Sequence, residues 1–293
     1  MNRILVATDL STRSDRALRR ATLLARQMTA TLTLVHVIDD DRPSRVLAAE
    51  RVESSAVLED LARTVRDIDG VACEARLLEG EPFDAIARAT EDTGSELVVM
   101  GPHRRQPLRD IFVGTTIDRT IRRCRRPVLM ANAVPAGRYV RVLVATDFSD
   151  CSAAALRAAE GLGFLAYTHT TILHAFDAPV RTMALRTALT REQTRDYIAA
   201  EEEHAAAQMA EFLRRTGHPS LPSTVQLLDV SAAETIRDYA RTYKADLVVI
   251  GAHGRISPPP LFLGSVVEEV LRGAEVDVLV VPHAAPASAN AVH

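Results

Sequence analysis

The chain has 293 residues, of which 47% are hydrophobic and 25% are charged, and its formal net charge is −3. This length is enough for two domains of about 140 to 150 residues, and the composition is that of an ordinary globular protein. The slight negative charge argues against a general nucleic-acid binder, and apolar runs such as Val278–Val281 are far shorter than the roughly 20 residues needed to span a bilayer.

Short apolar runs alternate with helical patterns along the first half of the chain. We expect strands at 4–8, 31–38, 71–78, 97–100 and 128–131, and helices at about 11–29, 43–69, 82–93 and 115–123. Strands that are apolar at consecutive positions are usually covered on both faces. With helices between them, these strands predict an α/β fold with a parallel, doubly wound sheet.

The second half repeats this pattern. Arg3–Ser11 returns as Arg141–Ser149 at an offset of 138 residues, and Glu96–His103 returns as Asp246–His253 at an offset of 150. Matches at so long a spacing indicate two copies of one folding unit, with a net insertion of 12 residues after the second strand of the second copy. We expect strands at 142–146, 170–176, 224–228, 247–250 and 276–281, and helical character from about 191 to 215.

The repeat sets the predicted domain boundaries. We expect one domain at 1–134, a second at 139–284 and a flexible tail at 285–293 that is rich in alanine, proline and serine. The linker between the domains contains Pro135 and Gly137. Because it is so short, we expect the two domains to pack against each other.

A glycine-rich loop follows the fourth strand of the second half. Gly251 and Gly254 are separated by two residues, nine residues follow, and Gly264-Ser265 then opens a helix. Glycine lets the backbone approach a phosphate closely, and free amides at a helix N-terminus attract negative charge. The combination of strand, spaced glycines and helix predicts a nucleotide site.

The chain resembles a tandem universal stress protein, and the resemblance covers nearly its whole length. It rests on the sequence Val-Leu-Val-Ala-Thr-Asp-Phe-Ser at Val142–Ser149, on the His174-Ala175 step and on the spaced glycine loop. It implies two five-stranded parallel sheets of strand order 3-2-1-4-5, related by a pseudo-twofold axis. It also implies ATP binding in the crevice at the carboxyl ends of the strands, where open α/β sheets bind ligands.

The resemblance also implies which residues form the second-half site. Asp147 should approach the ribose or a phosphate bridged by Mg²⁺, and the main chain at Ala175 should hydrogen-bond adenine. Other positions should line the base and sugar or hold the phosphates: Ala145, Ile250, Gly251, Gly254, Gly264, Ser265 and Val266. The chain departs from the family pattern at Ala145, where ATP-binding members often carry proline, and at the three prolines of 258–260, which remove amide donors.

The first half keeps the loop spacing but carries Arg104 where the second glycine should be. Arg104 either fills the pocket and leaves a structural domain, or pairs with a phosphate and preserves binding. The corresponding site residues in this half would be Asp9, Val37, Gly101, Gly114 and Thr115.

Asp9 and Asp147 also have a purely structural interpretation. Each precedes a serine, Ser11 or Ser149, that is predicted to cap a helix, so each aspartate could simply accept hydrogen bonds from local amides.

The histidines allow a similar choice. His36 and His174 end the second strands and are expected to be structural. His103 and His253 lie in the glycine loops, where they serve either the loop or the ligand.

Cysteine usage and the start of the chain favour a cytoplasmic protein. Cys73, Cys124 and Cys151 are odd in number and lack CxxC spacing, so neither a disulfide framework nor a zinc site is expected. Met1-Asn2-Arg3 leads directly into the first expected strand and leaves no room for a signal peptide.

The leading functional hypothesis is a stress-response or signalling protein that binds ATP or another adenine nucleotide and responds to its occupancy. No catalytic motif is apparent. The alternatives are a slow ATPase or phosphoryl-transfer enzyme that uses Asp147 with Mg²⁺, and a nucleotide-free scaffold. The resemblance further implies pairing through the fifth strands, which would give an intramolecular pseudo-dimer and leaves homodimer formation open.

Overall fold

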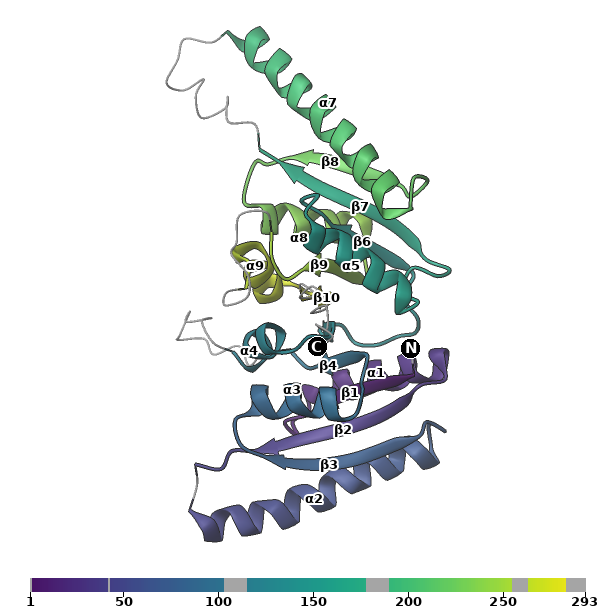
Figure 1. The fold of residues 1–293 in the computed structure, drawn as a ribbon, viewed down its shortest axis with the longest axis vertical. Helices are drawn as coiled ribbons and strands as arrows, with labels where there is room; N and C mark the ends of the chain where they lie inside the picture. Colours follow the sequence, from purple (N-terminus) through teal and green to yellow (C-terminus); the bar gives the residue numbers. More distant parts are fainter. Residues whose placement is uncertain (1, 42, 103–114, 178–189, 255–262, 283–293) are drawn as a thin grey trace, which may run out of the picture.

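The computed structural model describes residues 2–41, 43–102, 115–177, 190–254 and 263–282, and its two halves repeat one order of elements (Figure 1). The first half contains β1 (Arg3–Ala7), α1 (Ser14–Met28), β2 (Thr31–Ile38), α2 (Ser44–Asp67), β3 (Cys73–Glu79), α3 (Pro82–Asp92), β4 (Leu97–Met100), α4 (Thr116–Arg123) and β5 (Val128–Met130). The second contains β6 (Arg141–Ala145), α5 (Asp150–Gly161), β7 (His169–Phe176), α7 (Arg191–Thr216), β8 (Ser223–Leu227), α8 (Ala232–Tyr243), β9 (Leu247–Gly251), α9 (Ser265–Gly273) and β10 (Asp277–Val281). Within the described ranges, no helix is both long and apolar enough to cross a membrane.

The strands form a single ten-stranded sheet in the order β3-β2-β1-β4-β5-β10-β9-β6-β7-β8. Each half keeps the expected order 3-2-1-4-5 with parallel neighbours. The halves join through β5 and β10, which run antiparallel with Leu129 opposite Leu279. The expected pairing through the fifth strands is confirmed, and it joins the two expected five-stranded sheets into one continuous sheet.

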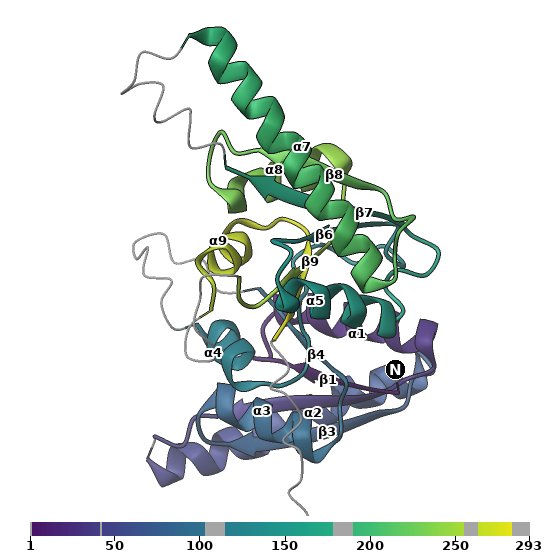
Figure 2. The same ribbon diagram turned by 45° about the horizontal axis from the view of Figure 1, so that its top comes forward.

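Both faces of this sheet are covered by helices that belong to both halves. In β1, Ile4 and Val6 enter one core while Leu5 and Ala7 enter the other. The first core contains buried residues of α1, α2, α5 and α7, and the second contains those of α3, α4, α8 and α9 (Figure 2). Burial on both faces explains why the strands are apolar at consecutive positions.

The first helices of the two halves begin differently. Ser149 caps α5 by accepting a hydrogen bond from the Ser152 amide, as predicted. The prediction that Ser11 caps the corresponding helix is wrong, because α1 begins only at Ser14. The Ser11 carbonyl instead accepts from the Ser14 amide at 3.0 Å, and this tight backbone turn takes the place of a side-chain cap.

A buried ion pair joins the two halves beside the β5–β10 contact. Arg20 of α1 lies 2.7 Å from Asp277 of β10 (Nε to Oδ2), with exposed side-chain fractions of 4% and 0%. The Tyr139 hydroxyl donates to Asp277 Oδ2 at 2.7 Å, and the Ala133 amide donates to Oδ1 at 2.9 Å. Arg20 also lies 4.4 Å from the centre of the Tyr139 ring and donates to the Gly137 carbonyl. The linker between the halves is thus held by polar contacts from both sides.

Burial raises the pKa of Asp277 above its ordinary value, although the charge of Arg20 and the hydrogen bond from Tyr139 favour the ionised form. The cost of removing this carboxylate from water is therefore only partly offset. Removing one charge of such a pair leaves the other buried without compensation.

We expect Asp277→Asn to lower the free energy of unfolding by about 3 kcal/mol or more, because Arg20 then carries an unpaired buried charge. Urea denaturation of the full chain measures the loss. Adding Arg20→Met should recover part of it. Asp60→Asn is the control, because it breaks the exposed Arg63–Asp60 pair and should cost at most about 1 kcal/mol. Equal losses from Asp277→Asn and Asp60→Asn would contradict a special role for the buried pair.

Candidate functional site

A cavity of about 650 Å³ lies in the second half at the carboxyl ends of β6, β7 and β9, with α7, α8 and α9 around it. The structure brings together at this cavity all of the second-half residues that the sequence singled out: Ala145, Asp147, Ala175, Ile250, Gly251, Gly254, Gly264, Ser265 and Val266. These residues come from three strands, from two loops and from the start of α9, which are distant from one another in sequence. Their convergence makes this cavity the candidate site.

Several lining residues were not anticipated from the sequence. Leu173, Ala232 and Ile236 add apolar surface, and α7 contributes Glu201, His204, Ala205 and Gln208. The α7 positions follow the spacing of one helix face, which is the signal that could have found them.

Asp147 closes a local turn and also lines the cavity. Its Oδ1 accepts hydrogen bonds from the Ser149 amide at 3.1 Å and from the Ser149 hydroxyl. A Cβ atom built on Gly254 would lie 2.9 Å from Asp147 Oδ2, so a larger residue would require this carboxylate to move. The structural and the ligand-binding interpretations of Asp147 are therefore compatible.

A metal at Asp147 would need ligands from a bound molecule. Among the described residues, the one group of three or more carboxylates, histidines or cysteines close enough to share an ion is the exposed cluster Asp39, Asp40 and Asp41, just after β2. A Mg²⁺ ion at the cavity would therefore take phosphate oxygens as further ligands, the arrangement usual for this metal.

The N-terminus of α9 faces the cavity without a side-chain cap. Its N-cap residue is Gly264, whereas the N-caps of α5, α7 and α8 are Ser149, Thr190 and Ser231, each with a side-chain hydrogen bond. The Gly264 amide itself donates to the Ala252 carbonyl at 2.9 Å and holds the loop rather than a ligand. The amides of the first turn have no intrahelical acceptor and are suited to bind an anion.

Gly251 has a packing role besides its place in the loop. A Cβ atom at this position would lie 2.9 Å from the Cys151 sulfur and 3.0 Å from the Cys151 backbone. A Cβ atom at the corresponding Gly101 would lie 3.2 Å from the backbone of Arg13 and Ser14. These glycines allow the fourth strand of each half to meet the first helix, a requirement independent of any ligand.

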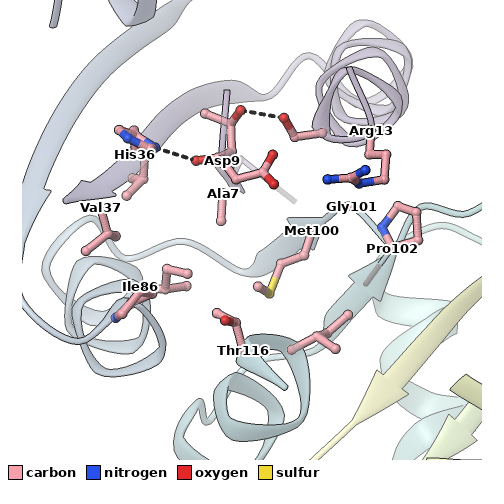
Figure 3. A pocket seen from close by; sticks show the side chains of 15 residues that line it. Ala7, Asp9, Arg13, His36, Val37, Ile86, Met100, Gly101, Pro102 and Thr116 are labelled. Carbon is pink, nitrogen blue, oxygen red and sulfur yellow. Dashed lines mark hydrogen bonds between the residues drawn. The ribbon is translucent and has the colours of Figure 1, made fainter. Parts of the chain in front are cut away.

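The first half contains a smaller cavity of about 290 Å³ at the corresponding place (Figure 3). Asp9, Val37 and Gly101 line it, as expected, whereas Gly114 and Arg104 lie outside the described residues. Thr115 is not among its lining residues, because its side chain accepts from the Asp118 amide at 3.3 Å and caps α4; the next residue, Thr116, lines the cavity instead.

Larger side chains reduce the first cavity. Arg13 reaches into it on the same side as Asp9, opposite Ile86 and Thr116 (Figure 3), and stands where the second half has Cys151. Pro82 and Met100 likewise correspond to Ala232 and Ile250. Burial raises the pKa of Asp9, but hydrogen bonds from Ser11 and the charge of Arg13 outweigh it and hold the pKa below its ordinary value.

The histidines at the ends of β2 and β7 have structural partners. His36 Nδ1 lies 2.8 Å from the Thr8 carbonyl oxygen, and His174 Nδ1 lies 2.8 Å from that of Thr146. The two halves make these contacts in the same way, in agreement with the structural interpretation. His174 and His253 also line the large cavity.

We expect Gly251→Ala to lower the free energy of unfolding by about 1–3 kcal/mol, because the added methyl group overlaps the Cys151 sulfur and backbone. Gly161→Ala is the matched control. Gly161 ends α5 with open space around it, so alanine should be neutral or stabilising there. Urea denaturation compares the two variants, and equal stability of both would contradict the packing role.

Comparison with known proteins shows which family has this architecture. The model of the universal stress protein family matches residues 1–132 and again residues 138–282. The universal stress protein Rv2005c of Mycobacterium tuberculosis is 25% identical over 296 residues, covering 94% of this chain and 96% of the relative.

Solved structures share the fold along the whole chain. A universal stress protein from Archaeoglobus fulgidus superposes with a TM-score of 0.67 at 21% identity, covering 96% of this chain and 98% of the other. The protein PA1789 from Pseudomonas aeruginosa, of unknown function, gives a TM-score of 0.66 at 20% identity, covering 96% and 92%. The chain therefore belongs to the universal stress protein family and carries two copies of its domain in tandem.

Proposed function

We propose that the second half binds an adenine nucleotide, with ATP as the first candidate, and that the protein acts in stress response or signalling through the occupancy of this site. The observation that carries the proposal is the cavity of about 650 Å³ that ends at the uncapped N-terminus of α9. Its volume falls within the range of about 300–1,000 Å³ that is usual for ligand sites.

The two ends of the cavity suit the two ends of a nucleotide. In the sheet, β6 lies between β9 and β7, and strands lie about 4.8 Å apart. The α9 end, which follows β9, offers amides for phosphates, and the β7 end offers the backbone at Ala175 for a base. Leu173, Ile236 and Ile250 supply apolar surface between them. The residues present therefore fit the proposed ligand.

The polar groups of the site support ligand binding better than they support rapid catalysis. Asp147, the carboxylate nearest the glycine loop, accepts two hydrogen bonds from Ser149 and so serves the turn as well as the cavity. Bound Mg²⁺ would supply charge neutralisation at the phosphates. The free, buried state of Cys73, Cys124 and Cys151 agrees with the cytoplasmic location that we propose.

We expect ATP to bind the full chain, and Gly254→Arg to reduce its affinity at least tenfold, because the arginine side chain would enter the space between the loop and Asp147. Isothermal titration calorimetry measures both affinities. Gly161→Arg adds the same charge at an open helix end and should bind like the wild type. Wild-type protein that binds no adenine nucleotide would reject the proposal, and equal affinity in wild type and Gly254→Arg would reject the assigned site.

The difference in volume between the two cavities predicts how many ATP molecules bind to each chain. The first-half cavity is less than half the size of the second, about 290 Å³ against about 650 Å³, and Arg13 projects into it. We expect the same titration to give one ATP per chain. Two equivalent sites per chain would show that Arg13 and the bulkier lining of the first half do not prevent binding.

A further inference from the structure

The helix that follows the second strand of the second half, α7, lines the cavity of that half. Glu201, His204, Ala205 and Gln208 follow one face of α7, and all four line the cavity. No described residue of α2, the corresponding helix of the first half, lines the smaller cavity there. The polar wall from α7 is therefore a property of the second half alone.

This wall lies at the end of the cavity opposite α9. α7 is the outermost helix of the second half and packs against β7 and β8 (Figure 1). The C-terminal half of α7 packs into the core through Met209 and Phe212, whose side chains are 2% exposed. If phosphates bind at α9, two strand spacings away, then α7 faces the base rather than the phosphates.

Gln208 and His204 are linked to each other on this wall. Gln208 Nε2 donates a hydrogen bond to His204 Nε2 over 3.0 Å, within one helical turn. Gln208 is half-buried and His204 is exposed, so the glutamine is the inner residue of the pair. In this arrangement the Gln208 amide nitrogen is the donor, which requires the His204 ring to carry its proton on Nδ1. The carboxamide retains a second N–H donor and its Oε1 acceptor.

We propose that Gln208 recognises the adenine edge of the bound nucleotide and that His204 is a positioning residue that orients its amide. This inference rests on the proposed function of the site. A glutamine amide can donate to N7 of adenine and accept from its N6 amino group. Guanine presents acceptors at both N7 and O6, so the Oε1 atom of an amide held in this orientation would face another acceptor. The α7 wall therefore selects adenine over guanine.

The test compares ATP and GTP binding to the full chain by isothermal titration calorimetry. We expect the wild type to prefer ATP, and Gln208→Ala to weaken ATP binding about tenfold while GTP binding changes little. His204→Ala should lower the ratio of ATP to GTP affinity in the same direction by a smaller factor. A purely structural role for His204 would weaken both nucleotides equally and leave this ratio unchanged.

Gln27→Ala is the matched control, since Gln27 is an exposed glutamine on α1 and lines neither cavity. Alanine is a good helix former, so each substitution should leave the fold intact. A wild type that binds ATP, with the same ATP to GTP ratio in Gln208→Ala, would overturn this inference alone. A wild type that binds neither nucleotide would overturn the proposed function and this inference together.

Discussion

The antiparallel contact between β5 and β10 is the constraint on which the rest of the structure depends. It turns two five-stranded units into one sheet and places the linker beside a buried polar cluster of Arg20, Asp277 and Tyr139. Edge strands expose unpaired backbone groups, and the tandem chain covers two of its four edges internally. Burying the charged pair costs free energy of desolvation. Its ion pair and hydrogen bonds form together only when the two halves meet in this one arrangement. We infer that it contributes more to the register of the contact than to net stability.

Within this shared frame the two halves have diverged at the ends of their strands. Corresponding residues line both cavities, and the histidine contacts to Thr8 and Thr146 are the same. The differences lie in side-chain volume, as at Arg13, and in the helix that follows the second strand. Duplication allows one half to keep a spacious site while the other preserves the fold and the interface. Larger side chains such as Arg13 line the first cavity, whereas residues of α7 line only the second.

Glycine spacing in this chain combines two physical requirements that the sequence alone does not separate. Gly254 leaves room for Asp147 at the cavity, whereas Gly251 lets β9 approach α5. Gly264 leaves α9 uncapped and uses its own amide to close the loop onto Ala252. Only the positions of the neighbouring atoms distinguish glycines needed for packing from those needed for a ligand.

The sequence by itself determined the repeated doubly wound architecture, because consecutive apolar residues, caps and glycine spacing are local signals. It also identified, through a family resemblance, the second-half residues that meet at one cavity. It could not reveal the Arg20–Asp277 pair or the turn at Ser11, since each depends on which backbone and side-chain atoms meet after folding. The same holds for Gln208, whose place in the wall is decided by how α7 crosses the strands. These contacts depend on tertiary packing. The spacing of apolar residues along a helix indicates which of its faces is buried, but it does not indicate which other elements that face packs against.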